Sequence, residues 1–189
     1  MTESVNRGAG TDAFVKENNK AENPMTQARI EKITLNIGSG RDQSKLDKAV
    51  MLIEQITGIK PVKTVTNKRV AAWGLRPGLP IGCKLTLRGK QARDVLSRIL
   101  EAKENKLKQS YFDENGNLSF GLSEYIDIPG VKYDTKIGMM GLQICVTFEK
   151  PGFRIKKRKL QKKKIPHKHL IKKEDTINYM KDNFKVQID

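Results

Sequence analysis

Residues 29–58 read RIEKITLNIGSGRDQSKLDKAVMLIEQITG, and the spacing of apolar residues changes within this stretch. Between residues 33 and 37 apolar and polar residues alternate, which predicts a strand with one buried face. After the GSG turn at 38–40, apolar residues recur every three or four positions from 46 to 56, which predicts an amphipathic helix closed by Gly58. A half-buried strand followed by such a helix is typical of an α+β layer.

The same two patterns continue to residue 151. Alternating segments predict further strands, and a second helical stripe predicts another helix. The expected strands cover 62–66, 81–88, 118–128 and 142–148, the helix covers 91–103, and a long loop covers 67–80. The predicted fold class is α+β: a five-stranded, mainly antiparallel sheet with helices packed on one face. The opposite face of that sheet would carry Lys, Thr and Asn side chains.

Three parts of the chain differ in composition. Residues 1–24 are polar and aperiodic, which predicts a flexible N-terminal arm, and residues 25–152 form the predicted core domain. Residues 153–189 form a basic C-terminal extension, in which the stretch from Arg154 to Lys173 holds 11 Lys or Arg and no acidic residue. We expect this block to order on a phosphate backbone rather than on its own, with a short helix over 173–185.

The net charge of the chain is +16, from 37 Lys and Arg against 21 Asp and Glu. Such an excess repels itself in a compact fold, so a polyanionic partner is expected. A membrane is not the expected partner, because no apolar run approaches the roughly 20 residues that span a bilayer and no signal peptide is recognisable. The charge therefore favours an intracellular protein that binds nucleic acid.

Metal and catalytic sites are not expected. The two histidines, His167 and His169, both lie in the basic extension, and Cys83 and Cys145 stand far apart. This arrangement predicts two buried free thiols rather than a zinc site, and it offers no nucleophile–histidine pair within the core. The GSG turn at 38–40 matches neither spacing of a nucleotide-binding loop, so a tight strand-to-helix turn is the better interpretation. We expect no enzyme activity, no metal and no cofactor.

The loop at 67–80 and the polar sheet face are the candidate RNA contacts. Trp73 stands close to basic residues, as in stacking platforms for RNA, although Trp73 folded back against the core is the alternative. Hydroxyl and amide side chains on the sheet suit 2′-hydroxyls and base edges, and lysines suit phosphates. An ordinary solvated sheet face would show the same pattern, so the pattern alone does not decide between them.

Three segments resemble a known family. They are RIEKITLNIGSG at 29–40, KPVKTVTNKRVAAWGLRPGLPIGCKLTLRG at 60–89 and FDENGNLSFGLSEYIDIPGVKYD at 112–134. The chain thereby resembles the universal large-subunit ribosomal protein number five family, whose members bind 5S rRNA. The resemblance implies the same five-stranded sheet, with 5S rRNA on its open face. The basic extension is similar to the archaeal and eukaryotic branch, whereas Ile59 replaces a glutamine of bacterial members.

The resemblance also implies partners and a location. These are 5S rRNA, large-subunit rRNA at the central protuberance, the elbow of P-site tRNA, a neighbouring 5S-binding ribosomal protein, and a small-subunit head protein across an intersubunit bridge. The expected location is the cytoplasm, on the large ribosomal subunit. Two alternatives stay open: a free-standing RNA chaperone or regulatory RNA-binding protein, and an enzyme that uses the GSG turn for a nucleotide.

The residues expected at each interface follow from the polar face, the basic extension and the resemblance. Those assigned to rRNA are Arg29, Lys32, Thr34, Asn36, Thr64, Thr66, Lys84, Thr86, Arg154, Lys156, Lys157 and Arg158. Those assigned to tRNA are Lys68, Arg69, Val70, Ala71, Ala72, Trp73, Leu75 and Arg76.

Overall fold

A computed structural model describes residues 23–188, so nearly all of the expected N-terminal arm lies outside the described residues. The main element is a five-stranded sheet in the order β2-β3-β1-β6-β5, and every neighbouring pair is antiparallel. The strands are β1 (Arg29–Gly38), β2 (Val62–Val65), β3 (Pro80–Leu87), β5 (Leu118–Leu122) and β6 (Leu142–Glu149). The predicted sheet is confirmed.

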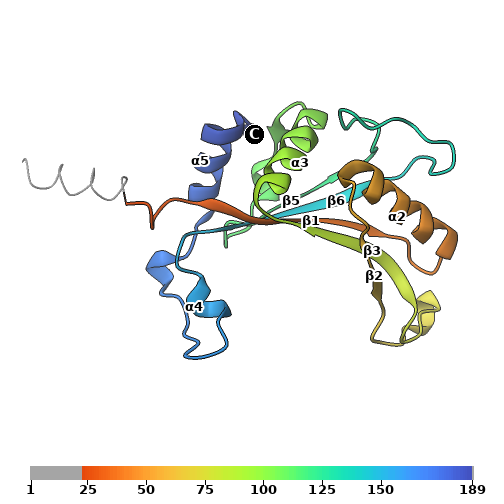
Figure 1. The fold of residues 1–189 in the computed structure, drawn as a ribbon, viewed down its shortest axis with the longest axis horizontal. Coiled ribbons are helices and arrows are strands. Elements are labelled where there is room, and N and C mark those ends of the chain that lie inside the picture. The colour runs from red at the N-terminus through yellow and green to blue at the C-terminus, as the bar shows by residue number, and fades with distance from the viewer. Residues whose placement is uncertain (1–22, 189) are drawn as a thin grey trace, which may run out of the picture.

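Helices cover one face of the sheet, as Figure 1 shows. They are α2 (Gln43–Thr57), α3 (Gly89–Ala102) and α5 (Lys173–Phe184). Alternate residues of the central strand β1, Ile33, Leu35 and Ile37, are buried on this side. Together with the apolar stripes of α2 and α3 they form the core, which makes the hydrophobic effect the main force joining the two layers. The α+β class expected from the sequence is therefore confirmed.

Helix α2 has well-defined ends. The Asp42 side chain accepts a hydrogen bond from the backbone N–H of Lys45 at its start, and Gly58 closes its end with a left-handed backbone at φ 72°. Only a residue without a side chain adopts that conformation at little cost, which is why glycine commonly ends helices. These two signals fix the length of α2 and so the point at which the chain returns to the sheet.

The predicted strand at 118–128 is too long. Strand β5 ends at Leu122, and residues 123–141 form an irregular segment that lies beside the helices. Tyr125 and Ile128 are buried, and the Arg98 side chain donates to the carbonyl of Pro129. Tyr125 and Ile128 are three positions apart, whereas residues on one face of a strand are two apart. The apolar residues of this stretch therefore pack against the helices and do not extend the sheet.

The end of the chain is part of the core. Ile171, Met180 and Val186 are buried with the residues of the sheet and helices. Strand β7 (Gln187–Ile188) pairs in parallel with β4 (Lys106–Leu107), far away in the sequence. The short helix expected over 173–185 is confirmed as α5. Residues 171–188, which were predicted as part of the basic extension, therefore complete the core.

Residues 153–170 lie on the other side of the sheet from α2 and α3. They contain the short helix α4 (Arg154–Lys157) and the 3-10 turn η3 (His167–His169), and we call them the arm (Figure 1). Two further 3-10 turns, η1 (Ala71–Trp73) and η2 (Gln109–Tyr111), complete the elements. Within residues 23–188, every helix is too short or too polar to cross a bilayer.

The packing of α5 gives a first prediction. Met180→Ala should lower the free energy of unfolding by about 2–4 kcal/mol, because it empties a fully buried position. The measurement is urea unfolding followed by circular dichroism. Lys181→Ala, an exposed change on the same helix, should stay within about 0.5 kcal/mol of the parent. Equal effects of the two changes would show that α5 is not anchored to the core.

Candidate nucleic-acid interface

The face of the sheet opposite α2 and α3 is polar. The strand register places Thr34 of β1 beside Thr86 of β3 and Cys145 of β6, and Asn36 beside Lys84 and Gln143. The Asn36 side chain donates to the Oε1 atom of Gln143 at 3.1 Å. The residues that alternate with the buried ones, and so form what we call the open face, are Lys32, Thr34, Asn36, Val62, Thr64, Lys84, Thr86, Ser119, Gln143, Cys145 and Thr147.

Cysteine burial was predicted correctly at one position of two. Cys83 is buried on the helix side, and burial raises the pKa of its thiol to about 11. Cys145 is exposed, contrary to expectation. Its neighbours Ile144 and Val146 both point into the core, so the alternation of strand β6 directs Cys145 to the open face.

The edge strand β2 differs from the expectation at Thr66. Thr64 lies on the open face and is half-buried, but Thr66 is buried. Its hydroxyl donates to the carbonyl of Leu79 at 3.2 Å. The register shifts between Thr64 and Val65, which ends the simple alternation there. Thr66 therefore belongs to the base of the following loop, and the prediction that it points from the open face is wrong.

Residues 66–79 form a hydrogen-bonded loop that we call the hairpin loop. Backbone bonds join Thr66 to Leu79 near its base and Val70 to Leu75 near its tip. Trp73 lies at the tip with 71% of its surface exposed, so the alternative in which it caps the core is wrong. Because the loop is already ordered, binding of the exposed indole to a partner would cost little further conformational entropy.

The expected tRNA contacts divide into two groups. Leu75 is 8% exposed, so it supports the loop from inside and its side chain is not offered to a partner. Val70 is half-buried. The remaining expected residues are exposed: Lys68, Arg69, Ala71, Ala72, Trp73 and Arg76. Ile59, the position that departs from bacterial relatives, is half-buried and packs against the core.

Two carboxylates hold the arm against the sheet. Nζ of Lys157 lies 2.6 Å from Oε1 of Glu31 and 2.8 Å from Oε2 of Glu149. Glu149 also binds Arg29 at 2.8 Å, and Glu31 binds Arg88 at 3.2 Å. Lys157 and Arg29, both expected to bind rRNA, thus face carboxylates within the protein. Because each already has an anionic partner, they are weaker candidates for phosphate contacts than the other basic residues of the site.

The surroundings of Glu31 favour its charged form. Burial alone would raise the pKa of this carboxyl, but hydrogen bonds from Lys157 and Arg88 outweigh burial and hold the pKa below its ordinary value. Burial likewise disfavours the charge on Lys157, yet the two carboxylates raise its pKa. The pairing of β1 with β6 shifts register between Ile30 and Lys32. Glu31 is the extra residue at this shift and so forms a β-bulge in β1.

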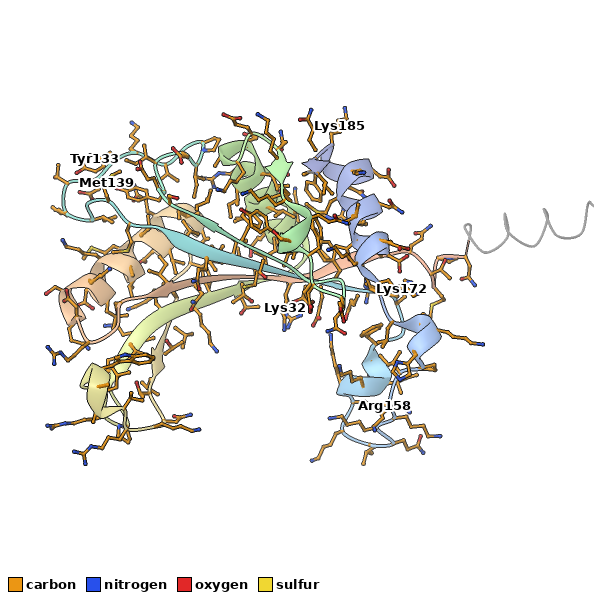
Figure 2. All side chains as sticks on the ribbon, turned by 180° about the vertical axis from the view of Figure 1, so that it is seen from behind. Lys32, Tyr133, Met139, Arg158, Lys172 and Lys185 are labelled. Atoms are coloured by element: carbon orange, nitrogen blue, oxygen red, sulfur yellow. The ribbon has the colours of Figure 1, made fainter. Side chains whose placement is uncertain are left out.

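The hairpin loop and the arm project from the same side of the sheet. Figure 2 shows Lys32 on the open face between them and Arg158 on the arm. Arg154, Lys156 and Arg158, expected to bind rRNA, are exposed on the arm. The expected site residues thus gather on one concave side, except for Thr66 and Leu75. The expected set omitted Ser119, Gln143 and Thr147, which the period-two pattern of β5 and β6 could have revealed.

The GSG turn is structural. The backbone N–H groups of Ser39 and Gly40 both donate to the carbonyl of Ile81. The first turn of α2 is capped by Asp42, whose carboxylate would repel a phosphate. Among residues 23–188, moreover, no group of three or more His, Cys, Asp or Glu could hold a metal ion. The turn joins β1 to α2, as expected.

The fold and this surface define a class: a basic α+β protein whose polar sheet face is left open between two basic projections. Comparison with known proteins places it within that class. Residues 23–76 match the family model described as ribosomal protein L5, and residues 80–179 match the model that describes the C-terminus of the same ribosomal protein family. The chain belongs to the ribosomal L5 family.

Similar proteins come from several archaea and carry the name large ribosomal subunit protein uL5. The protein of Methanobrevibacter smithii is 49% identical over 87% of this chain and 96% of its own length. That of Sulfurisphaera tokodaii is 44% identical over 88% and 94%, and that of Nanoarchaeum equitans is 47% identical over 88% and 99%. The chain is thus of the archaeal type, a structural component of the large ribosomal subunit in the cytoplasm, with rRNA as its partner and no enzyme activity.

Acid should release the arm. The folded pKa of Glu31 lies below its usual value of 4.5, so its stabilising effect is complete above pH 4.5 and is lost as pH falls through the folded pKa. Glu31→Gln should cost about 1–3 kcal/mol at pH 7 and should flatten the fall in stability at acid pH. Urea unfolding between pH 7 and 3 measures both effects. Glu54→Gln, at an exposed position, controls for the loss of one charge. An unchanged acid slope in Glu31→Gln would contradict this role.

Proposed function

We propose that this chain binds 5S rRNA on its open face and joins it to the large-subunit rRNA at the central protuberance. The observation that carries the proposal is the open face itself, where Thr34, Thr86 and Asn36 lie side by side between two basic projections. Membership of the ribosomal L5 family supports it, because the family model and the relatives belong to the large subunit. The protein would act by positioning RNA, without chemistry.

The side chains of the open face suit RNA in particular. Hydroxyl and amide groups can bind 2′-hydroxyls and base edges in the wide, shallow minor groove of an A-form helix. Lys32 and Lys84 stand at positions from which they can reach phosphates. The helix layer and the irregular segment 123–141 lie on the other side, so RNA would approach the molecule from the concave side alone.

The arm would add affinity that depends on salt. Each lysine that neutralises a phosphate releases counterions, which makes binding sensitive to ionic strength but not to sequence. Besides Arg154, Lys156 and Arg158, the exposed run 162–164 contributes three further lysines. Lys157 has a different task, because its pairing with Glu31 and Glu149 orients the arm toward the RNA.

The hairpin loop would reach the elbow of P-site tRNA. Its exposed indole can stack on an unpaired base or a ribose, while Arg69 and Arg76 can approach phosphates. Leu75 would act indirectly by holding the tip in shape.

Protein partners would use the other side of the molecule. Tyr133 and Met139 are exposed on segment 123–141, away from the open face, as Figure 2 shows. Exposed aromatic and methionine side chains are typical of protein contacts. We assign this side to the small-subunit head protein of an intersubunit bridge, and the remaining exposed sides to a neighbouring 5S-binding ribosomal protein. A free-standing RNA chaperone is the alternative function; it would bind many RNAs equally.

A filter-binding titration tests the main proposal. With 5S rRNA and a control RNA of equal length, at about 50 and 200 mM salt, the preference for 5S rRNA should survive the higher salt. Thr86→Val should weaken 5S rRNA binding about 2- to 10-fold with little change in salt dependence, because it removes a hydroxyl without removing charge. Equal binding of both RNAs that collapses with salt would contradict the proposal and favour the chaperone.

The arm should control the salt dependence. Replacing Lys162, Lys163 and Lys164 together by alanine should reduce the slope of log affinity against log salt by about 1 for each lysine that contacts a phosphate. Substitution is the correct experiment, because truncation after Gly152 would also remove the buried residues Ile171 and Met180. An unchanged slope would mean that these lysines contact no phosphate.

The tip of the hairpin loop should matter for tRNA and not for stability. Trp73→Ala should change the free energy of unfolding by less than about 0.5 kcal/mol, because the indole is exposed. Large subunits assembled with this variant should bind a tRNA fragment that contains the elbow more weakly, by about 5- to 100-fold if a stacking contact is lost. Affinity for 5S rRNA should not change. Normal tRNA binding by Trp73→Ala would exclude the indole from this contact.

A further inference from the structure

A hollow of about 780 Å³ lies where the arm meets the sheet. Its walls come from three parts of the chain: the open face, the turn at 113–117 that precedes β5, and the arm. Lys32 and Thr147 belong to the first, and Asn115 and Asn117 to the second. Phe153 and Lys162 line the hollow from the arm. The volume is within the range of about 300–1,000 Å³ that is usual for pockets that hold small molecules.

The charge in the hollow is positive. Lys32, Lys156 and Lys162 line it, whereas the carboxylate of Glu31 on its wall is already paired with Lys157 and Arg88. A ligand with a single negative charge would therefore find lysines on several sides without facing an uncompensated carboxylate. A phosphate group has the right charge and the right acceptors for such a place.

The hollow also has an apolar wall with a fixed ring. Phe153 lies with its ring centroid 6.1 Å from that of His169, and a ring nitrogen of His169 is hydrogen-bonded to the carbonyl of Pro151 at 2.7 Å. Phe148, Leu170 and Ile171 continue the apolar wall. A planar aromatic ligand could stack on such a surface, as bases do on the aromatic side chains of RNA-binding proteins.

The turn at 113–117 supplies polar groups of the kind that read base edges. It is closed by two backbone hydrogen bonds, from Asp113 to the carbonyl of Asn117 and from Gly116 to that of Asp113. Gly116 is held tightly against Ile171 and α5: a Cβ atom there would lie 2.5 Å from Cγ2 of Ile171 and 2.7 Å from Oγ1 of Thr176. Asn115 and Asn117 line the hollow, and the Asn115 amide is oriented by donating to Oδ2 of Asp113 at 3.2 Å. Its second N–H and its Oδ1 stay available as a donor and an acceptor.

We propose that this hollow takes a single unstacked nucleotide, which the bound RNA turns out of its strand. The base would stack on Phe153 and bind the amides of Asn115 and Asn117, while Lys32, Lys156 and Lys162 bind its phosphates. The proposal rests on the proposed function, because the hollow opens beside the open face that would bind the RNA. A stack, two amides and three lysines in one place favour a nucleotide over an acidic peptide, which would use the lysines alone.

The test compares variants of the whole chain bound to 5S rRNA and to a large-subunit rRNA fragment. Phe153→Leu keeps the apolar bulk of the arm but removes the aromatic plane, and Asn115→Ala removes an exposed amide. Each should weaken binding of one of the two RNAs about 5- to 100-fold. Lys159→Ala, on the arm but outside the walls of the hollow, should alter salt dependence alone. Zero-length ultraviolet cross-linking of the parent should join one nucleotide to the peptides that contain Phe153 or Asn115.

The outcomes separate this inference from the proposed function. Suppose that Phe153→Leu and Asn115→Ala both keep full affinity and the preference for 5S rRNA, and that the parent gives no cross-link. This result would overturn the hollow as a nucleotide site and leave the proposed function intact. Loss of affinity in Lys162→Ala alone would mean that the hollow holds phosphate and not a base, which also overturns it. Competition by polyglutamate without any nucleotide cross-link would assign the hollow to an acidic peptide. Equal binding of all RNAs would overturn both proposals.

Discussion

The central strand β1 constrains the rest of the molecule. It is hydrogen-bonded along both edges, to β3 and to β6, so each of its residues must point either to the helices or to the open face. Ile33, Leu35 and Ile37 take the first direction and organise the core. Thr34 and Asn36 take the second and lie in the middle of the open face. A shift of one residue in this strand would exchange the two sets, so burial of the core also fixes the position of the site.

The bulge at Glu31 is where this alternation is interrupted, and the interruption has a structural use. It places a carboxylate close to Glu149, and the two acids hold Lys157 at the start of the arm. Without the cations that pair with them, the carboxylates of Glu31 and Glu149, which share Lys157 as a partner, would repel each other. Arg29, Arg88 and Lys157 therefore serve the shape of the protein, whereas Arg154, Lys156 and Arg158 are exposed on the arm and belong to none of these ion pairs. In a protein of such high positive charge, a few acidic residues decide which cations are available.

Much of the fold could be predicted from the sequence because its signals are local. The alternation around Ile33 and the stripe from Leu46 to Ile56 each depend on neighbours within a few residues. The position of residues 171–188 could not be predicted, because a basic stretch next to a short amphipathic helix gives no sign of its distant partner, strand β4. Thr66 and Cys145 were misjudged for a similar reason: a register shift and a face assignment depend on pairing across strands. The burial of Leu75 depends in the same way on how the hairpin loop closes. The role of Lys157 could not be predicted either, because nothing in the basic run around it indicates a pairing with Glu31 and Glu149.

The pairing of Lys157 with Glu31 joins residues that are 126 positions apart in the chain. Closing a loop of that length costs conformational entropy, and the pairing of β1 with β6 spans nearly the same separation, so it is this pairing that first brings Glu31 and Glu149 together. The helices and the strands near β1 can associate early, but the arm can dock only after the sheet has brought Glu31 and Glu149 together. The complete concave surface is thus a property of the fully folded molecule alone. A chain that has stopped at a partly folded stage would carry the same charge without the docked arm, so charge alone would not distinguish it from the finished protein.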